Sequence, residues 1–99
     1  LMTGREKGDL KTIENKIVTF DQFGFLKDEK DMGYVVFTVK EVIGEFFFGG
    51  SVLTEDLIEL EQEGYREEIE KDGLPILLTR KMSKNKREYT AVTYYPASN

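Results

Sequence analysis

The chain has 99 residues and a formal net charge of −5, from 14 lysines and arginines against 19 aspartates and glutamates. This length provides one domain with a modest hydrophobic core. Cysteine and histidine are both absent, so disulfide frameworks, thiolate or imidazole metal sites, and Ser-His or Cys-His catalysis are excluded. We therefore expect a non-enzymatic protein with no metal and no cofactor.

The first half of the chain predicts three strands after a flexible arm. Residues 1–12 are polar, contain two glycines and show no periodicity, which is typical of an arm. Runs of β-branched and aromatic residues predict strands over 13–26, 34–42 and 45–48. A charged turn at 27–33 separates the first two. Strands joined by such short links form an antiparallel meander.

The second half predicts a helix followed by a final pair of strands. Thr54 is a suitable N-cap, and apolar residues at helical spacing follow it as far as Gly64, with a further turn or short helix after it. Strands are expected over 74–79 and 89–95. This order of elements predicts a mainly β fold: an OB-like, five-stranded Greek-key barrel over residues 13–99, with one helix between strands three and four.

Charge is divided unevenly along the chain. Residues 54–72 hold two bases and nine acids, whereas residues 73–99 hold five bases and one acid. All five bases of that last segment lie between Arg80 and Arg87. The acidic total therefore does not exclude a local site for nucleic acid, because the charge is polarised between a helix and a hairpin.

The basic hairpin has two interpretations. Its cations are either solvated residues that protect a strand edge from aggregation, or contacts for phosphate groups. In an OB-fold, the loops that join strands one and two and strands four and five border the oligonucleotide groove. The candidate phosphate contacts from these loops are Lys27, Lys30, Arg80, Lys81, Lys84, Lys86 and Arg87.

Three consecutive phenylalanines are candidate stacking platforms for nucleic-acid bases. Neighbouring strand residues alternate between faces, so Phe46 and Phe48 share one side and Phe47 takes the other. Both sides cannot face the same core, and we expect at least one exposed aromatic side chain. In the preceding strand, alternation predicts Val35, Phe37 and Val39 in the core and Tyr34, Thr38 and Lys40 toward the groove.

The acidic helix over 54–72 has a simpler interpretation. Carboxylates cover its whole predicted surface, whereas catalytic carboxylates are normally recessed, and no calcium-loop spacing occurs. We expect a solvated face or a surface for contact with another protein.

The sequence resembles the small single-stranded DNA-binding proteins of phages and integrated mobile elements of Gram-positive bacteria. The resemblance rests on 33–39, on 46–50 leading into Leu53 and Thr54, and on the basic hairpin through Tyr89. It implies an OB-fold that protects or presents single strands during replication or recombination. The chain departs from the bacterial type in having no tryptophan for stacking.

The favoured function is therefore single-stranded DNA binding, with RNA as the related ligand, through aromatic stacking and the basic hairpin. The alternative is a protein-interaction module that acts through the acidic helix 54–72 on a basic partner. Association into a homo-oligomer through exposed strand edges is compatible with both. No apolar run has the length of a membrane span and no signal peptide is recognised, so we expect a cytoplasmic protein without membrane contact.

Overall fold

Nine short elements make up the computed structural model, which describes residues 2–94. Tyr95, where the last predicted strand ends, lies outside the described residues, as does the end of the predicted domain at 99. The elements are β1 (Glu6–Lys7), η1 (Leu10–Ile13), β2 (Lys16–Lys27), β3 (Gly33–Val39), β4 (Glu45–Gly49), α1 (Ser51–Gln62), α2 (Arg66–Lys71), β5 (Leu74–Met82) and β6 (Glu88–Tyr94).

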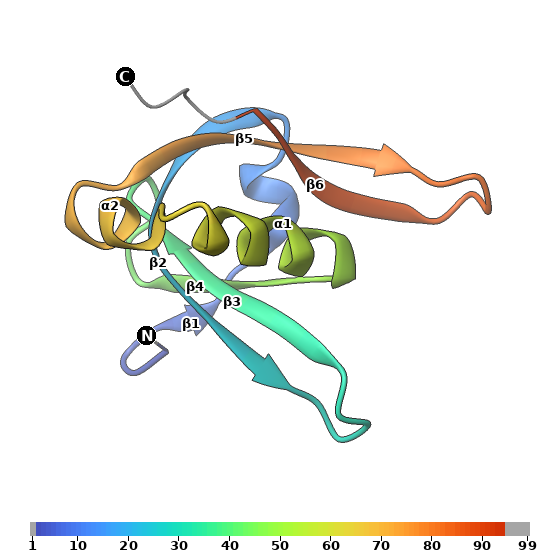
Figure 1. Ribbon diagram of the computed structural model, residues 1–99, viewed down its shortest axis with the longest axis horizontal. Helices are drawn as coiled ribbons and strands as arrows, with labels where there is room; N and C mark the ends of the chain where they lie inside the picture. The colour runs from blue at the N-terminus through green and yellow to red at the C-terminus, as the bar shows by residue number, and fades with distance from the viewer. Residues whose placement is uncertain (1, 95–99) are drawn as a thin grey trace.

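The strands form one six-stranded sheet in the order β1-β4-β3-β2-β5-β6. The expected antiparallel meander is confirmed, because β3 pairs antiparallel with both β2 and β4. The long strand β2 pairs with β3 through its second half and with β5 through its first half. As a result, the hairpins β2–β3 and β5–β6 both project from the same side of the molecule (Figure 1).

The mainly β prediction is confirmed, but the strands form a six-stranded open sheet where a five-stranded Greek-key barrel was expected. The sheet is open, and in the described part of the chain β6 pairs only with β5. The outer edge of β4 pairs instead with the additional strand β1, and α1 contacts β3, β4 and β6. The first helix ends just before Gly64, where the sequence predicts its end and where φ is +91°, and the further turn or short helix expected after it is α2.

The core lies between one face of the sheet and the helices. Val35, Phe37 and Val39 are buried as alternation predicts, together with Phe47 and the α1 leucines. The start of α1 differs from the prediction. The helix begins at Ser51, so Thr54 lies inside it and its hydroxyl donates to the Gly50 carbonyl at 2.7 Å. In the sequence alone, a threonine inside a helix that bonds to a carbonyl of the preceding turn cannot be distinguished from a threonine at the N-cap.

Regular structure begins at Glu6, ahead of the Ile13 start that the sequence predicts. The backbone explains the difference: the N–H groups of Glu6 and Gly8 donate to carbonyls of Gly44 and Phe46 at 2.9 and 2.7 Å. Gly8 is required here, because a Cβ at this position would lie 2.5 Å from a ring carbon of Phe47. Main-chain pairing of this kind leaves no periodicity in the sequence.

Candidate nucleic-acid interface

Three aromatic rings gather on the outer side of β3 and β4. The Phe48 ring centroid lies 5.4 Å from that of Tyr34 and 5.3 Å from that of Phe46, and both pairs meet edge to face. All three rings are half-buried, whereas Phe47 is fully buried on the inner side against Phe37. We call Tyr34, Phe46 and Phe48 the aromatic cluster. The predicted alternation is confirmed, and it removes Phe47 from the candidate platforms.

The N-terminal segment adds a cation to the aromatic cluster. The Lys7 ammonium, on β1, lies 5.5 Å from the centroid of the Phe48 ring, within the range of a cation–π contact. Phe48 and residues 7–10 line an open hollow of about 430 Å³. Sequence reasoning missed Lys7, because a two-residue strand inside a polar segment carries no pattern that distinguishes it from an arm.

A second hollow, of about 590 Å³, lies at the tip of the β2–β3 hairpin and ends at Tyr34. Lys27 and Lys30 line it as expected, but so do Asp28 and Glu29. The Lys27 ammonium is 3.4 Å from the Asp31 carboxylate. The Asp28 carboxylate accepts from the backbone N–H groups of residues 30 and 32, both at 2.9 Å. The acids of this tip therefore offset its bases locally.

A third hollow, of about 650 Å³, separates the β5–β6 hairpin from η1 and the start of α1. Arg87 and Tyr89 line one wall and Leu10 lines the other. Leu10 also lines the hollow beside Lys7. The first and third hollows share Leu10, and the ring contact between Tyr34 and Phe48 places the second hollow beside the first. We call this series of hollows the surface path.

The tip of the β5–β6 hairpin presents unpaired cations. Lys84, Lys86 and Arg87 are exposed, and none of them forms an ion pair with another residue in the range 2–94. The turn is closed by Lys86 N–H donating to the Ser83 carbonyl and Ser83 N–H donating to the Arg87 carbonyl, both at 2.9 Å. Lys86 adopts a φ of +59°, a conformation that glycine tolerates better.

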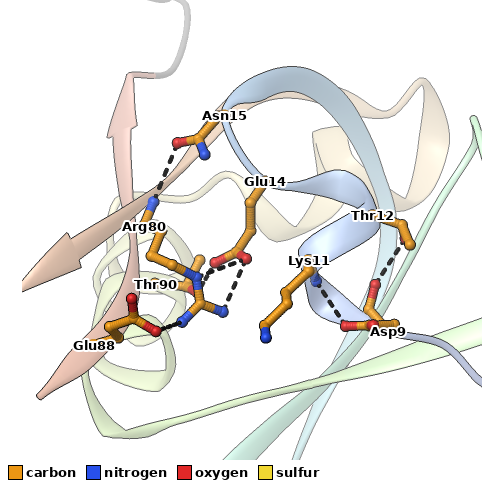
Figure 2. A network of polar contacts seen from close by, with 8 residues as sticks. All are labelled: Asp9, Lys11, Thr12, Glu14, Asn15, Arg80, Glu88 and Thr90. Carbon is orange, nitrogen blue, oxygen red and sulfur yellow. Dashed lines mark hydrogen bonds and ion pairs between the residues drawn. The ribbon is translucent and has the colours of Figure 1, made fainter.

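Arg80 has a different environment from its neighbours in sequence. Its guanidinium lies 2.9 Å from the Glu14 carboxylate and 3.1 Å from that of Glu88 (Figure 2). The hydrogen bond that Arg80 donates to Glu14 is the main reason that the pKa of Arg80 is raised above its ordinary value. Glu14 also accepts a hydrogen bond from the Thr90 hydroxyl. This network joins the end of η1 to the last hairpin, and sequence reasoning had identified only Arg80 among its members.

Three further predicted residues line none of the three hollows. Thr38 is fully buried, and its hydroxyl donates to the Asp21 carboxylate, so its predicted exposure toward the groove is wrong. Lys40 follows β3 at the end opposite the hairpin tip, where its ammonium donates to the Asp72 carbonyl at 2.8 Å. Lys81, in β5, is exposed and close enough to Asp56 to affect its titration.

Several of the acids on α1 and α2 have internal roles. The Asp56 carboxylate accepts from the Val92 N–H at 2.9 Å, and its pKa is raised because burial disfavours the charged form. Arg66 pairs with Glu61 and Glu70, while its guanidinium lies 4.0 Å from the Phe23 ring centroid. No group of three or more potential metal ligands occurs among the described residues.

Neither α1 nor α2, the two α-helices within 2–94, has the length and apolarity that a membrane crossing requires.

A comparison of the chain with protein-family models, curated proteins and solved structures finds no match.

Proposed function

We propose that the protein binds single-stranded nucleic acid, most directly single-stranded DNA, along the surface path, and that it has no catalytic activity. The observation that carries the proposal is that the three hollows of the path lie next to one another. They place half-buried aromatic rings near a hairpin tip where Lys84, Lys86 and Arg87 form no ion pair with another residue in 2–94. Sequence-tolerant binding of single strands needs this combination, since every nucleotide has a base to stack and a phosphate to neutralise.

The strand connectivity supports an OB-like fold as the scaffold. Strand β2 pairs with both β3 and β5, as the first strand of a five-stranded Greek-key barrel does, and the sheet stays open between β4 and β6. In OB-folds that bind oligonucleotides, the ligand lies over strands two and three between two loops. Those positions correspond to the aromatic cluster and the two hairpin tips, where the surface path runs.

The chemistry of the path indicates how a strand would be held. Bases would stack on Phe48 and its two neighbours in the aromatic cluster, each contact contributing about 1–3 kcal/mol. Phosphates would contact Lys7 beside the Phe48 ring, and Lys84, Lys86 and Arg87 at the far hairpin. Paired bases do not expose a free face to such rings, so duplex DNA should bind more weakly than a single strand.

The uneven charge supports selectivity. The segment 54–72, which includes most of α1 and all of α2, holds nine acids against two bases, so this part of the surface repels nucleic acid. Binding is thereby confined to the side of the molecule that carries the cations and the rings. Protection or presentation of single strands during phage or mobile-element replication and recombination is the cellular role that we propose.

The test is a fluorescence-anisotropy titration of the protein into a labelled single-stranded thymidine oligonucleotide at increasing salt concentration. We expect binding at low salt and a steep loss of affinity with salt, about 0.7 log units per log unit of salt for each phosphate contact. Unlabelled single strands should compete better than duplex of the same length. The proposal is wrong if no binding occurs at low salt, or if duplex competes equally well.

A further inference from the structure

Arg80 is held between two carboxylates of very different exposure. The Glu14 side chain is 3% exposed; it accepts a hydrogen bond from Nε of Arg80 at 3.0 Å and forms an ion pair with Nη2 at 2.9 Å. The Glu88 side chain is 53% exposed and accepts only from Nη1, at 3.1 Å. The guanidinium thus has one edge held by a buried partner and one edge paired with an exposed partner, as Figure 2 shows.

The two ion pairs should differ in how readily they break. Separating Arg80 from Glu14 would leave a buried carboxylate without a counter-charge, which is strongly unfavourable. Separating Arg80 from Glu88 exposes both groups to water, and exposed ion pairs contribute little to stability. Only the Nη1 edge is therefore available for exchange with another anion.

That exchangeable edge lies in the third hollow of the surface path. Arg80, Arg87 and Glu88 all line this hollow. A guanidinium binds phosphate oxygens with the same geometry and charge assistance that it uses for carboxylate oxygens. The Glu88 carboxylate therefore accepts from Nη1 of Arg80 where a phosphodiester oxygen of a bound strand could accept instead.

We propose that the Glu88 carboxylate occupies a phosphate subsite, and that a backbone phosphate of a bound strand displaces it from Nη1 of Arg80. This inference rests on the proposed function and adds one subsite to it. Arg87 lines the same hollow and supplies a second cation near the subsite. Glu14 is a positioning residue: it holds the guanidinium in the orientation that presents Nη1 to the strand.

The displacement makes Glu88 a competitor of the ligand. Each binding event must break the Arg80–Glu88 pair and move a negative charge away from the incoming phosphate. Neutralising Glu88 should therefore strengthen binding. Loss of any negative charge beside the path would also reduce repulsion of the strand, so it is the dependence of the gain on Arg80 that identifies a displaced competitor.

The experiment measures the affinity of Glu88→Gln for the labelled single strand at low salt. We expect about fivefold tighter binding than the unsubstituted protein, the equivalent of one weak exposed ion pair. The matched control is Glu67→Gln on α2, which makes the same change in net charge at the opposite end of the molecule (Figure 1). Its affinity should be nearly unchanged.

A double-mutant cycle then assigns the gain to Arg80. Arg80→Lys keeps the charge, but a single ammonium cannot pair with Glu14 and also offer a second donor edge to Glu88 or a phosphate. Adding Glu88→Gln to Arg80→Lys should therefore give no gain in affinity. Should Arg80→Lys fail to fold, Glu88→Ala in the otherwise unsubstituted protein replaces it, because removing the acceptor must give at least the gain of Glu88→Gln.

The outcomes separate this inference from the proposed function. If the unsubstituted protein binds and Glu88→Gln gives no gain, or no more than Glu67→Gln, the subsite is wrong and single-strand binding stands. A gain that persists with Arg80→Lys also overturns the subsite. If neither the unsubstituted protein nor any variant binds, the proposed function itself fails.

Discussion

The two long hairpins look alike in sequence but differ in the charge that they make available. The tip over 27–33 has two bases and three acids, whereas residues 80–88 have five bases and one acid. In the first tip, Lys27 pairs with Asp31, and Asp28 accepts two backbone N–H groups. In the second, only Arg80 is paired with carboxylates, and Lys84, Lys86 and Arg87 extend into solvent.

The number of lysines in a loop therefore does not by itself determine how well the loop can bind phosphate. Local acids at the β2–β3 tip must be displaced or screened before Lys27 and Lys30 can contact a strand. For the proposed binding of a strand, we therefore expect most of the electrostatic binding energy to come from the β5–β6 tip. The β2–β3 hairpin would contribute mainly Tyr34, the ring that contacts the aromatic cluster beside its hollow.

The largest expected effect comes from reversing charge at one tip and then at the other. Lys84→Glu, Lys86→Glu and Arg87→Glu together should lower single-strand affinity at least about 100-fold, because three free cations become repulsive. The matched pair Lys27→Glu and Lys30→Glu should cost only several-fold. Anisotropy titrations of both variants at the same salt concentration measure the ratio.

Equal losses at the two tips would contradict the distinction between them. The same variants separate the alternative function, a basic protein partner held by the acidic segment 54–72. Such a partner should bind the Lys84, Lys86 and Arg87 variant undiminished, since α1 and α2 are untouched.

The next effect concerns the ring at the centre of the path. Phe48→Ala should weaken single-strand binding by about 1–3 kcal/mol, the contribution of one stacked base. Phe47→Ala is its control on the opposite face of the same strand: it should lower the free energy of unfolding by about 3–5 kcal/mol, as large-to-small changes in a core do. Urea denaturation and binding measured side by side test both. Unchanged binding by a folded Phe48→Ala protein would remove stacking from the account.

A smaller effect compares one residue at each tip. Asp31 and Lys86 both have a left-handed backbone, with φ of +63° and +59°. Lys86→Gly should relieve backbone strain and raise the free energy of unfolding by about 0.5 kcal/mol. It also removes one phosphate contact, so the slope of log affinity against log salt concentration should become less steep by about 0.7. Asp31→Gly releases Lys27 and should strengthen binding slightly. Thermal melts and salt titrations check these opposite signs; two variants that both weaken binding would contradict the account.

The smallest effect lies at the base of the β2–β3 hairpin. Partial burial favours a higher pKa for Glu41, but hydrogen bonds from the N–H and hydroxyl of Thr19 outweigh it and lower the pKa below 4.5. A lowered carboxyl pKa stabilises the fold above the ordinary value and loses that contribution as the pH falls through the lowered one. Glu41→Gln should therefore be less stable than the unsubstituted protein near neutral pH, by a margin that shrinks in acid. Denaturant midpoints at several pH values test this, and a pH-independent margin would refute it.

Alternation along strands predicted much of the fold and part of the site. It separated Phe47 from Phe46 and Phe48, and it identified the core residues Val35 and Phe37, because a strand next to a core must bury every second side chain. Alternation failed at Thr38, which is buried on the outer side because Asp21 satisfies its hydroxyl. A polar residue can occupy a buried position when a partner comes from another strand, and single-strand periodicity does not show such partners.

The remaining errors involve contacts between segments that are distant in sequence. Lys7 meets Phe48 through a two-residue parallel strand, and Glu14 meets Arg80 across 66 positions of the chain. Closure of the barrel depends in the same way on which segment pairs with the outer edge of β4. Composition and local pattern predict what an element is, but these interactions depend on which elements meet.

The most direct test of the proposed path is a map of backbone amide chemical shifts during titration with a single-stranded oligonucleotide. Binding along the path predicts shifts at 7–10, at Tyr34, at Phe48 and at 83–89, with the amides of α2 unaffected. Shifts confined to α1 and α2, or shifts at the β5–β6 tip with none at Phe48, would contradict a continuous path that joins the aromatic cluster to the free cations.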